Sequence, residues 1–403
     1  MTATRVPLDV VAMEGNKMLL SLGPQHPSTH GVLQVLTEIE GETITKADPE
    51  IGYLHTGIEK SAENLFWHQA STVIERMDYL SPLTNAMCYV LGVEQLLGIT
   101  SHIPERAQQL RVLLCELSRI ASHCVWLGTG GIDLGAISPF FYAFDLRENI
   151  LDLFEASGGA RMHPNYLRIG GLREDVPQGF LDRLDDLIKK FPGRVRELRG
   201  VLQKNPIVQD RMIDVAILSP EEALAWNITG PPLRGSGIAY DVRKAFPYSG
   251  YERYEFEVPV RTEGDAYARF LVRLDEMDES MSIIRQVREQ LVEGSVMIDD
   301  TKVGPPPKEA IALSMEALIH HFKYVSEGFR VPPGDVYQAV EGPRGELGYY
   351  IVSNGENRPW RVRTRPPSFY NLQVLKKLAI GELIADMVVC IGSLDPVFGE
   401  VDR

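Results

Sequence analysis

The beginning of the chain alternates apolar and polar positions with a period of two, which is typical of β-strands. This pattern predicts strands over residues 17–22, 32–40 and 43–46, with Glu40-Gly41-Glu42 as a hairpin turn. The segment GPQHPSTHG, residues 23–31, separates the first two strands, and its glycines and prolines predict a loop.

From residue 58 onward the apolar positions recur with a helical period. Ser81-Pro82 is typical of a helix start and Gly98 of a helix end. The pattern predicts helices over residues 82–97, 103–127, 140–156, 176–202 (with a break at Pro192-Gly193), 265–291 and 308–325.

Residues 103–127 are apolar on most faces, which predicts a central helix, and residues 265–291 carry the three-and-four spacing of a bundle seam. Residues 205–262 are rich in Gly, Pro and Tyr and predict irregular structure with short strands. Residues 334–365 return to strand patterning. We therefore expect an α+β fold, a central helix bundle flanked by β-sheet regions.

The expected organisation is one integrated domain with three regions. These are an N-terminal β region over 1–57, a helical core over 58–330 and a C-terminal β region with a tail over 331–403.

Composition is that of a globular chain, with 403 residues, 44% of them hydrophobic and 24% charged. The 41 basic and 55 acidic residues leave a net charge of −14, which argues against a nucleic-acid binder. The sequence contains no apolar run long enough for a membrane span, and we expect no signal peptide in its first residues.

The four cysteines, Cys88, Cys115, Cys124 and Cys390, are scattered and form no CxxC pair. Thiolate metal sites need clustered sulfurs, so we expect this chain to hold neither an Fe–S cluster nor a structural zinc. Buried, reduced thiols are the expectation instead of a disulfide framework.

The segment GTGGIDLG, residues 128–135, superficially resembles a dinucleotide-binding loop. Asp133 replaces the third glycine and a helix precedes the segment, whereas the motif follows a strand, so NAD binding is not expected. The sequence also lacks GxxxxGK[ST], GxSxG and HExxH.

Several polar residues lie at loops where two interpretations stay open. His26 and His30 share the loop 23–31, either bonded to backbone or lining a cleft where one could exchange protons. Tyr79 precedes a helix start and either packs or points into a cavity, while Asp133 and His163 lie beside glycine-rich turns as caps or as site residues.

Nine longer strings, in order, carry a specific resemblance that covers nearly the whole chain. They are GPQHPSTHGVL (23–33), IGYLHTGIEK (51–60), RMDYLS (76–81), ELSRIASH (116–123), DLGAISPFFYAF (133–144), GARMHPNYLRIGG (159–171), YDVRKAFPYSGYE (240–252), RGELGYYIVS (344–353) and SLDPVFGEVDR (393–403). Together they closely resemble the D subunit family of bacterial NADH:quinone oxidoreductase (respiratory complex I), called the 49 kDa subunit in mitochondria.

That family is similar to the large subunits of [NiFe] hydrogenases. The four positions that match the hydrogenase metal-binding cysteines are Asp78, Ser81, Val397 and Glu400. These residues cannot replace soft thiolate ligands, so the resemblance implies a retained scaffold without the metal. In the family, the vacated cavity is the quinone site.

The resemblance implies a role for each candidate residue. His30 and Tyr79 would hydrogen-bond the quinone headgroup, and Asp133 would pair with His30 and tune its proton supply. Arg76 and His163 would face the terminal [4Fe–4S] cluster, which the neighbouring B subunit carries. Some relatives have an arginine where this chain has Thr56, so the role of that arginine is not carried over.

The implied function is that of one chain of a proton-pumping NADH:quinone oxidoreductase, peripheral on the cytoplasmic side of the inner membrane. Its expected partners are the B, C, I and H subunits, with membrane contact through H, and FMN and the Fe–S clusters would belong to partner chains. The alternatives are a hydrogenase-like catalytic subunit, a purely structural assembly subunit, and a related complex that takes electrons from ferredoxin or a reduced deazaflavin.

Overall fold

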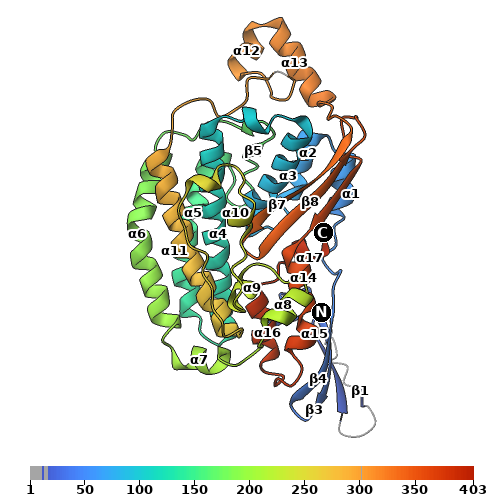
Figure 1. Ribbon diagram of the computed structural model, residues 1–403, viewed down its shortest axis with the longest axis vertical. Helices are drawn as coiled ribbons and strands as arrows, with labels where there is room; N and C mark the ends of the chain where they lie inside the picture. Colours follow the sequence, from blue (N-terminus) through green and yellow to red (C-terminus); the bar gives the residue numbers. More distant parts are fainter. Residues whose placement is uncertain (1–10, 13–16, 301) are drawn as a thin grey trace, which may run out of the picture.

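The computed structural model describes residues 11–12, 17–300 and 302–403 (Figure 1). The expectation of no signal peptide falls almost entirely on residues 1–10 and 13–16 and lies outside the described residues. Within the described part of the chain, no helix is both long and apolar enough to cross a membrane.

The N-terminal sheet forms one end of the elongated molecule (Figure 1). It is antiparallel, in the order β1 (Val11–Ala12), β2 (Lys17–Leu22), β3 (Gln34–Glu40) and β4 (Thr43–Glu50). Alternate residues of β3 are buried, as the period of two predicts. The predicted turn is present with Gly41 at φ 66°, and the loop 23–31 contains a single 3-10 turn, η1 (Pro27–Thr29).

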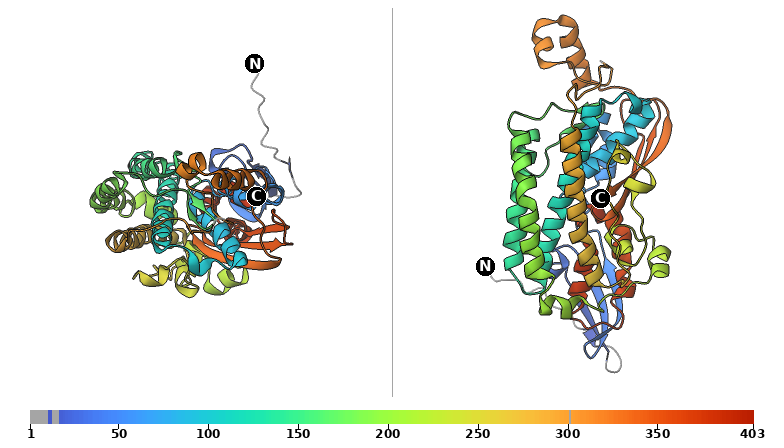
Figure 2. Two further views of the ribbon diagram at one scale, coloured as in Figure 1. Left: turned by 90° about the horizontal axis from the view of Figure 1, so that it is seen from above. Right: turned by 60° about the vertical axis from the view of Figure 1, so that its left-hand side comes forward.

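The long helices lie side by side along the molecule (Figure 2). They are α3 (Pro82–Leu97), α4 (Glu105–Asp133), α5 (Ser138–Gly158), α6 (Phe180–Leu202) and α11 (Ala266–Gln290). Helix α4 packs against α3, α5 and α11 and is buried on most faces, as its apolar pattern predicts. The small elements α1 (Ile58–Asn64), α2 (Trp67–Ile74), η2 (Thr100–His102), β5 (Leu167–Arg168) and β6 (Gly171–Leu172) fill the connections.

Two predicted helix boundaries are wrong. Helix α4 runs through the glycine-rich segment to Asp133, and these glycines let α5 approach: a Cβ on Gly128 would lie 3.3 Å from Phe140. Helix α6 continues through Pro192 without the predicted break. Pro192 is exposed, so the carbonyl group that it leaves without an amide partner can be solvated.

The short strands predicted within residues 205–262 are also wrong. The structure has short helices there: α7 (Pro206–Met212), α8 (Pro220–Ala225), α9 (Pro231–Gly235), α10 (Val242–Ala245) and η3 (Tyr251–Arg253). Three of them begin with proline, whose fixed φ suits the first helical position. Proline therefore starts helical turns here rather than only interrupting structure.

The C-terminal region is β only in its first half. Strands β7 (Gly334–Gly342), β8 (Gly345–Ser353) and β9 (Arg361–Arg365) form the predicted antiparallel sheet, which packs on α3. The tail, for which the sequence pattern predicted no elements, contains four short helices: α14 (Pro367–Gln373), α15 (Leu375–Leu378), α16 (Met387–Leu394) and α17 (Phe398–Asp402). Asp402, in the last of these helices, accepts the N–H groups of Gly52 at 2.9 Å and Leu54 at 2.7 Å, so the end of the chain lies against the segment that follows the N-terminal sheet.

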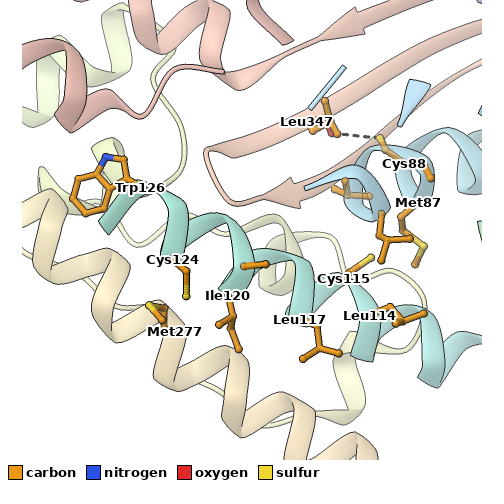
Figure 3. Close-up of a cluster of buried hydrophobic side chains, with 14 of the residues drawn as sticks. Met87, Cys88, Leu114, Cys115, Leu117, Ile120, Cys124, Trp126, Met277 and Leu347 are labelled. Carbon is orange, nitrogen blue, oxygen red and sulfur yellow. Dashed lines mark hydrogen bonds between the residues drawn. The ribbon is translucent and has the colours of Figure 1, made fainter. Parts of the chain in front are cut away.

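The core contains apolar side chains from α3, α4, α11 and the C-terminal sheet (Figure 3). Cys88, Cys115 and Cys124 lie within this cluster, and all four cysteines of the chain are free and buried, as expected. Burial raises the pKa of the Cys115, Cys124 and Cys390 thiols to about 12, so they stay protonated.

The core also contains pairs of charged side chains, and two of the nine strings contribute residues to them. Glu116 accepts a hydrogen bond from Arg243 at 3.0 Å, and Glu276 pairs with Arg234 at 2.7 Å and with His123 at 2.9 Å. All of these side chains are buried. Breaking such a pair would leave a buried charge without its partner, which is strongly destabilising. The strings ELSRIASH and YDVRKAFPYSGYE, which contain members of these pairs, therefore have a structural role here.

Candidate functional site

The last helix, α17, brings His30 and Tyr79 together. The His30 ring lies 5.9 Å from the Phe398 ring, centroid to centroid. The backbone of Phe398 is close enough to the Tyr79 phenol to lower its pKa, against the larger effect of burial. A Cβ on Gly399 would lie 2.6 Å from the Met77 carbonyl oxygen, so α17 lies directly against the turn that carries Tyr79. Two sequence-predicted residues from separate loops therefore meet at the C-terminal segment.

His30 and His26 behave differently in the loop 23–31. The Nδ1 atom of His26 accepts the Ser28 N–H at 3.2 Å, the backbone-bonded alternative considered from the sequence. His30 ends η1 in the left-handed region, at φ 54°. Although part of the residue is exposed in the loop, loss of solvent around its ring lowers its pKa. The charge of Asp395 opposes this shift, and the charge of Arg344 adds to it. The lowered pKa favours a neutral imidazole.

Tyr79 lies in the turn between α2 and α3, and Asp78 organises that turn. One oxygen of Asp78, Oδ1, accepts the backbone N–H groups of Leu80 at 3.1 Å and Ser81 at 3.2 Å. Burial raises the pKa of the half-buried Tyr79 phenol. A protonated phenol in this position can donate a hydrogen bond.

A buried ionic group, here called the Arg344 cluster, lies behind these two residues. It consists of Asp78, Arg344, Asp395 and Glu400. Arg344 donates to Asp78 Oδ2 at 2.8 Å and lies 3.4 Å from Asp395 Oδ2. Burial, followed by the charge of Asp78, raises the pKa of Glu400 to about 8. A protonated Glu400 lowers the number of negative charges that one guanidinium must balance.

The Arg344 cluster includes two of the four positions that match hydrogenase cysteines, Asp78 and Glu400. A third, Ser81, bonds through its hydroxyl to Thr84 at 2.8 Å and to Ser118 at 3.1 Å. Over residues 11–12, 17–300 and 302–403, no three His, Cys, Asp or Glu side chains are grouped as metal ligands. An arginine-centred ionic group thus lies where the resemblance places a vacated metal site.

Asp133 lies at the C-terminal end of α4, and burial raises its pKa to about 6. It faces α16, where a Cβ on Gly392 would lie 3.6 Å from its Oδ2. Among the described residues no hydrogen bond or ion pair joins Asp133 to His30, so their pairing stays a prediction. A carboxylate whose charge raises the pKa of His30 is Asp395, which sequence reasoning missed although it lies in the string SLDPVFGEVDR.

Arg76 and His163 lie near each other in a second region. Arg76 is exposed, and its charge, after the larger effect of burial, lowers the pKa of His163. Glu75, missed by sequence reasoning, connects their segments because its Oε2 accepts the Asn165 N–H at 3.0 Å. Burial raises the pKa of Glu75 to about 7, and its Oε1 has no hydrogen-bond partner.

A groove of about 740 Å³ lies elsewhere, between α3, residues 246–250 and β7. None of the five predicted site residues lines it. Four of them form two groups, His30 with Tyr79 at α17 and Arg76 with His163 near Glu75, and these groups define the candidate site, while Asp133 faces α16. Thr56, at the position where some relatives have an arginine, is exposed.

Comparison with known proteins identifies the family. The model of the family described as "Respiratory-chain NADH dehydrogenase, 49 Kd subunit" matches residues 133–403. The D 1 subunit of NADH-quinone oxidoreductase from Symbiobacterium thermophilum is 55% identical over 389 residues, or 96% of each chain. The D subunit from Geotalea uraniireducens is 51% identical over 96% of this chain and 98% of its own, and the D 2 subunit from Koribacter versatilis is 52% identical over 97% of each. The chain therefore belongs to the 49 kDa subunit family of respiratory complex I.

Proposed function

We propose that this chain forms the quinone headgroup pocket of an NADH:quinone oxidoreductase. The observation that carries the proposal is the meeting of His30 and Tyr79 at α17, both within reach of the charges of Asp395 and Arg344. A histidine and a tyrosine from different loops offer two donors that can bind the two carbonyl oxygens of a quinone.

Reduction of a quinone to a quinol takes two electrons and two protons. The Tyr79 phenol and the His30 imidazole would each donate a hydrogen bond to a carbonyl oxygen, and as negative charge develops there, the phenol and the imidazolium form of His30 would each give up one proton. Asp133, whose raised pKa of about 6 lies close to neutrality, would resupply protons from the end of α4. Asp395 would assist proton supply at His30 because its charge favours the imidazolium.

Electrons would come from a partner chain. The exposed guanidinium of Arg76 and the imidazole of His163 would face the [4Fe–4S] cluster of the B subunit, which when bound there would supply single electrons. NADH and FMN would bind to other chains. We infer that the protein assembles with the B, C, I and H subunits on the cytoplasmic side of the inner membrane, and that quinone reduction drives proton translocation in the membrane arm.

We also infer that the scaffold is that of a [NiFe] hydrogenase large subunit without its metal. The support is the Arg344 cluster, in which Asp78 and Glu400 replace two thiolate positions and are bound by Arg344 and by the Ser368 N–H. An arginine and carboxyl groups offer no soft ligand for nickel. Stoichiometric nickel in the purified chain would contradict this inference.

The pocket is tested in the assembled complex with His30→Ala and Tyr79→Phe, measured separately. We expect each variant to lose NADH:quinone activity by at least tenfold and to keep NADH oxidation by an artificial acceptor such as ferricyanide. His26→Ala is the matched control because His26 shares the loop but bonds to Ser28. Parental quinone reduction in both test variants would refute the assignment.

A further inference from the structure

Helices α12 (Lys308–Leu313) and α13 (Met315–Ser326) form a hairpin that projects from the body (Figures 1 and 2). It lies at the end of the molecule away from the N-terminal sheet (Figure 1). Neither helix contains a buried residue. The single helix predicted over 308–325 is therefore wrong: the chain turns at Ser314, whose extended backbone caps α13.

The hairpin exposes a continuous set of large apolar side chains, here called the outer face. Its members are exposed by 46–88% and consist of Leu313, Met315, Leu318, Ile319, Phe322 and Val325. Those within α13 recur at spacings of three and four, which places them on one side of the helix. Such a stripe is typical of a helix that packs against another element, but nothing in the described chain covers it.

The opposite side of the hairpin is attached to the body. The Tyr324 ring stacks on His68 at 4.5 Å between centroids, and Asn357 donates to the Glu327 carbonyl at 2.6 Å. A Cβ on Gly328, at φ 67°, would lie 3.3 Å from Phe66. These contacts hold the hairpin with its outer face away from the molecule, so a partner would meet a preformed surface.

We propose that the outer face docks into an apolar groove on another protein chain of the oxidoreductase complex. The proposal rests on membership in a family of complex subunits and is independent of the quinone pocket. A helix in an apolar groove is a common recognition mode that uses anchors with this spacing. Phe322, an exposed aromatic flanked by Leu318 and Val325, would be the central anchor.

A second copy of the chain and a lipid surface fit the outer face less well. Two copies with a net charge of −14 each would repel each other. Helices that lie on membranes carry many Lys and Arg residues on their polar face. Helix α13 has Lys323 alone, with Glu316 and two histidines.

The first test places a photoreactive benzophenone amino acid at position 322 in the complete complex in its native membrane. We expect a crosslink to another chain of the complex, identified by mass spectrometry. A crosslink to lipid or to a second copy of this chain, or no crosslink to any other chain of the complex, would overturn the proposal. This result does not depend on His30 or Tyr79, so it is separable from failure of the quinone pocket.

The second test is the double variant Leu318→Asp/Phe322→Asp. We expect at least a tenfold loss of assembled complex on native gels. The matched control, Lys323→Asp, adds a charge change on the same helix outside the outer face and should leave assembly at the parental level. Circular dichroism of each purified chain checks folding; parental assembly by a folded double variant would contradict the proposal.

Discussion

Arg344 and Asp78, separated by 266 positions in the chain, are joined in the interior by a hydrogen bond of 2.8 Å from Nη1 to Oδ2. Both side chains are buried. The other oxygen of Asp78 accepts two backbone N–H groups of the turn that carries Tyr79. The charge pair therefore connects the C-terminal sheet to a turn of the candidate site.

Removing the guanidinium should be strongly destabilising. We expect Arg344→Met to lower the free energy of unfolding by about 3–5 kcal/mol, because it leaves buried carboxylates without their cation. Arg330→Met is the matched control: Arg330 is exposed, and its contact with Glu356 at 3.9 Å is worth about 0–1 kcal/mol. Chemical denaturation of the purified chains measures both, and equal losses would show that burial of the pair is unimportant.

The pH dependence of stability should report on Glu400. Its pKa is raised to about 8 in the folded chain against 4.5 ordinarily, so the folded state holds the proton more tightly. Stability linked to this group is fully present below pH 4.5 and is lost as the pH rises through about 8. We expect Glu400→Gln to reduce the fall of melting temperature between pH 5 and 8. An unchanged slope would mean that Glu400 ionises normally.

The identity of the carboxylate beside His30 can be tested kinetically. Asp395 raises the pKa of His30 against the larger effect of burial, so Asp395→Asn should lower that pKa further. Asparagine suits the left-handed backbone of residue 395, at φ 54°. In the assembled complex we expect the alkaline limb of the pH profile of quinone reduction, on which His30 loses the proton that it donates, to move to lower pH. A comparable shift in Asp133→Asn would instead favour the pairing of Asp133 with His30.

Two glycine substitutions near the site should have opposite effects. A Cβ on Gly399 would lie 2.6 Å from the Met77 carbonyl oxygen, so Gly399→Ala must displace the turn of Tyr79. We expect it to lose about 1–3 kcal/mol of stability, the usual cost of overpacking, and to reduce quinone reduction. Gly130→Ala, in α4 with open space at its Cβ, should gain up to about 1 kcal/mol. Thermal unfolding distinguishes them, and a neutral Gly399→Ala would contradict the tight packing.

The thiols should be unreactive in the folded chain. All four cysteines are buried, and burial raises their pKa. Titration with a thiol reagent at pH 8 should detect almost no fast reaction in the native protein and all four thiols after unfolding. A fast native thiol would show that one of these residues is accessible.

Local sequence signals predicted the elements whose pattern extends over many residues. Strands β2 and β3 and the helix α11 (Ala266–Gln290) lie where the periods of two and of three to four place them. Proline misled once, because Pro192 was predicted to break a helix and is tolerated on an exposed side of α6. Solvent exposure and neighbouring elements decide such cases, and neither can be read from the local pattern.

In the candidate site, too, some residues could be predicted from the sequence and others could not. His30 and Tyr79 were found from sequence because each lies in a string characteristic of the family, and the structure brings them to one helix. Asp395, Arg344 and Glu75 were missed. Each acts through a contact with a distant segment of the chain. The sequence alone does not show whether a charged residue is buried or exposed to solvent.

The sequence by itself determined the family, the periodic helices and strands, the absence of clustered thiolates and two donors of the proposed pocket. Only the tertiary structure decided that Asp395 lies close enough to raise the pKa of His30, how Arg344 joins the C-terminal sheet to the turn of Tyr79, and that the apolar stripe of α13 lies outside the core. The physical reason is the distance along the chain over which each property is set. Backbone preference and side-chain period are local properties of the chain, whereas burial and charge pairing depend on which distant segments pack together.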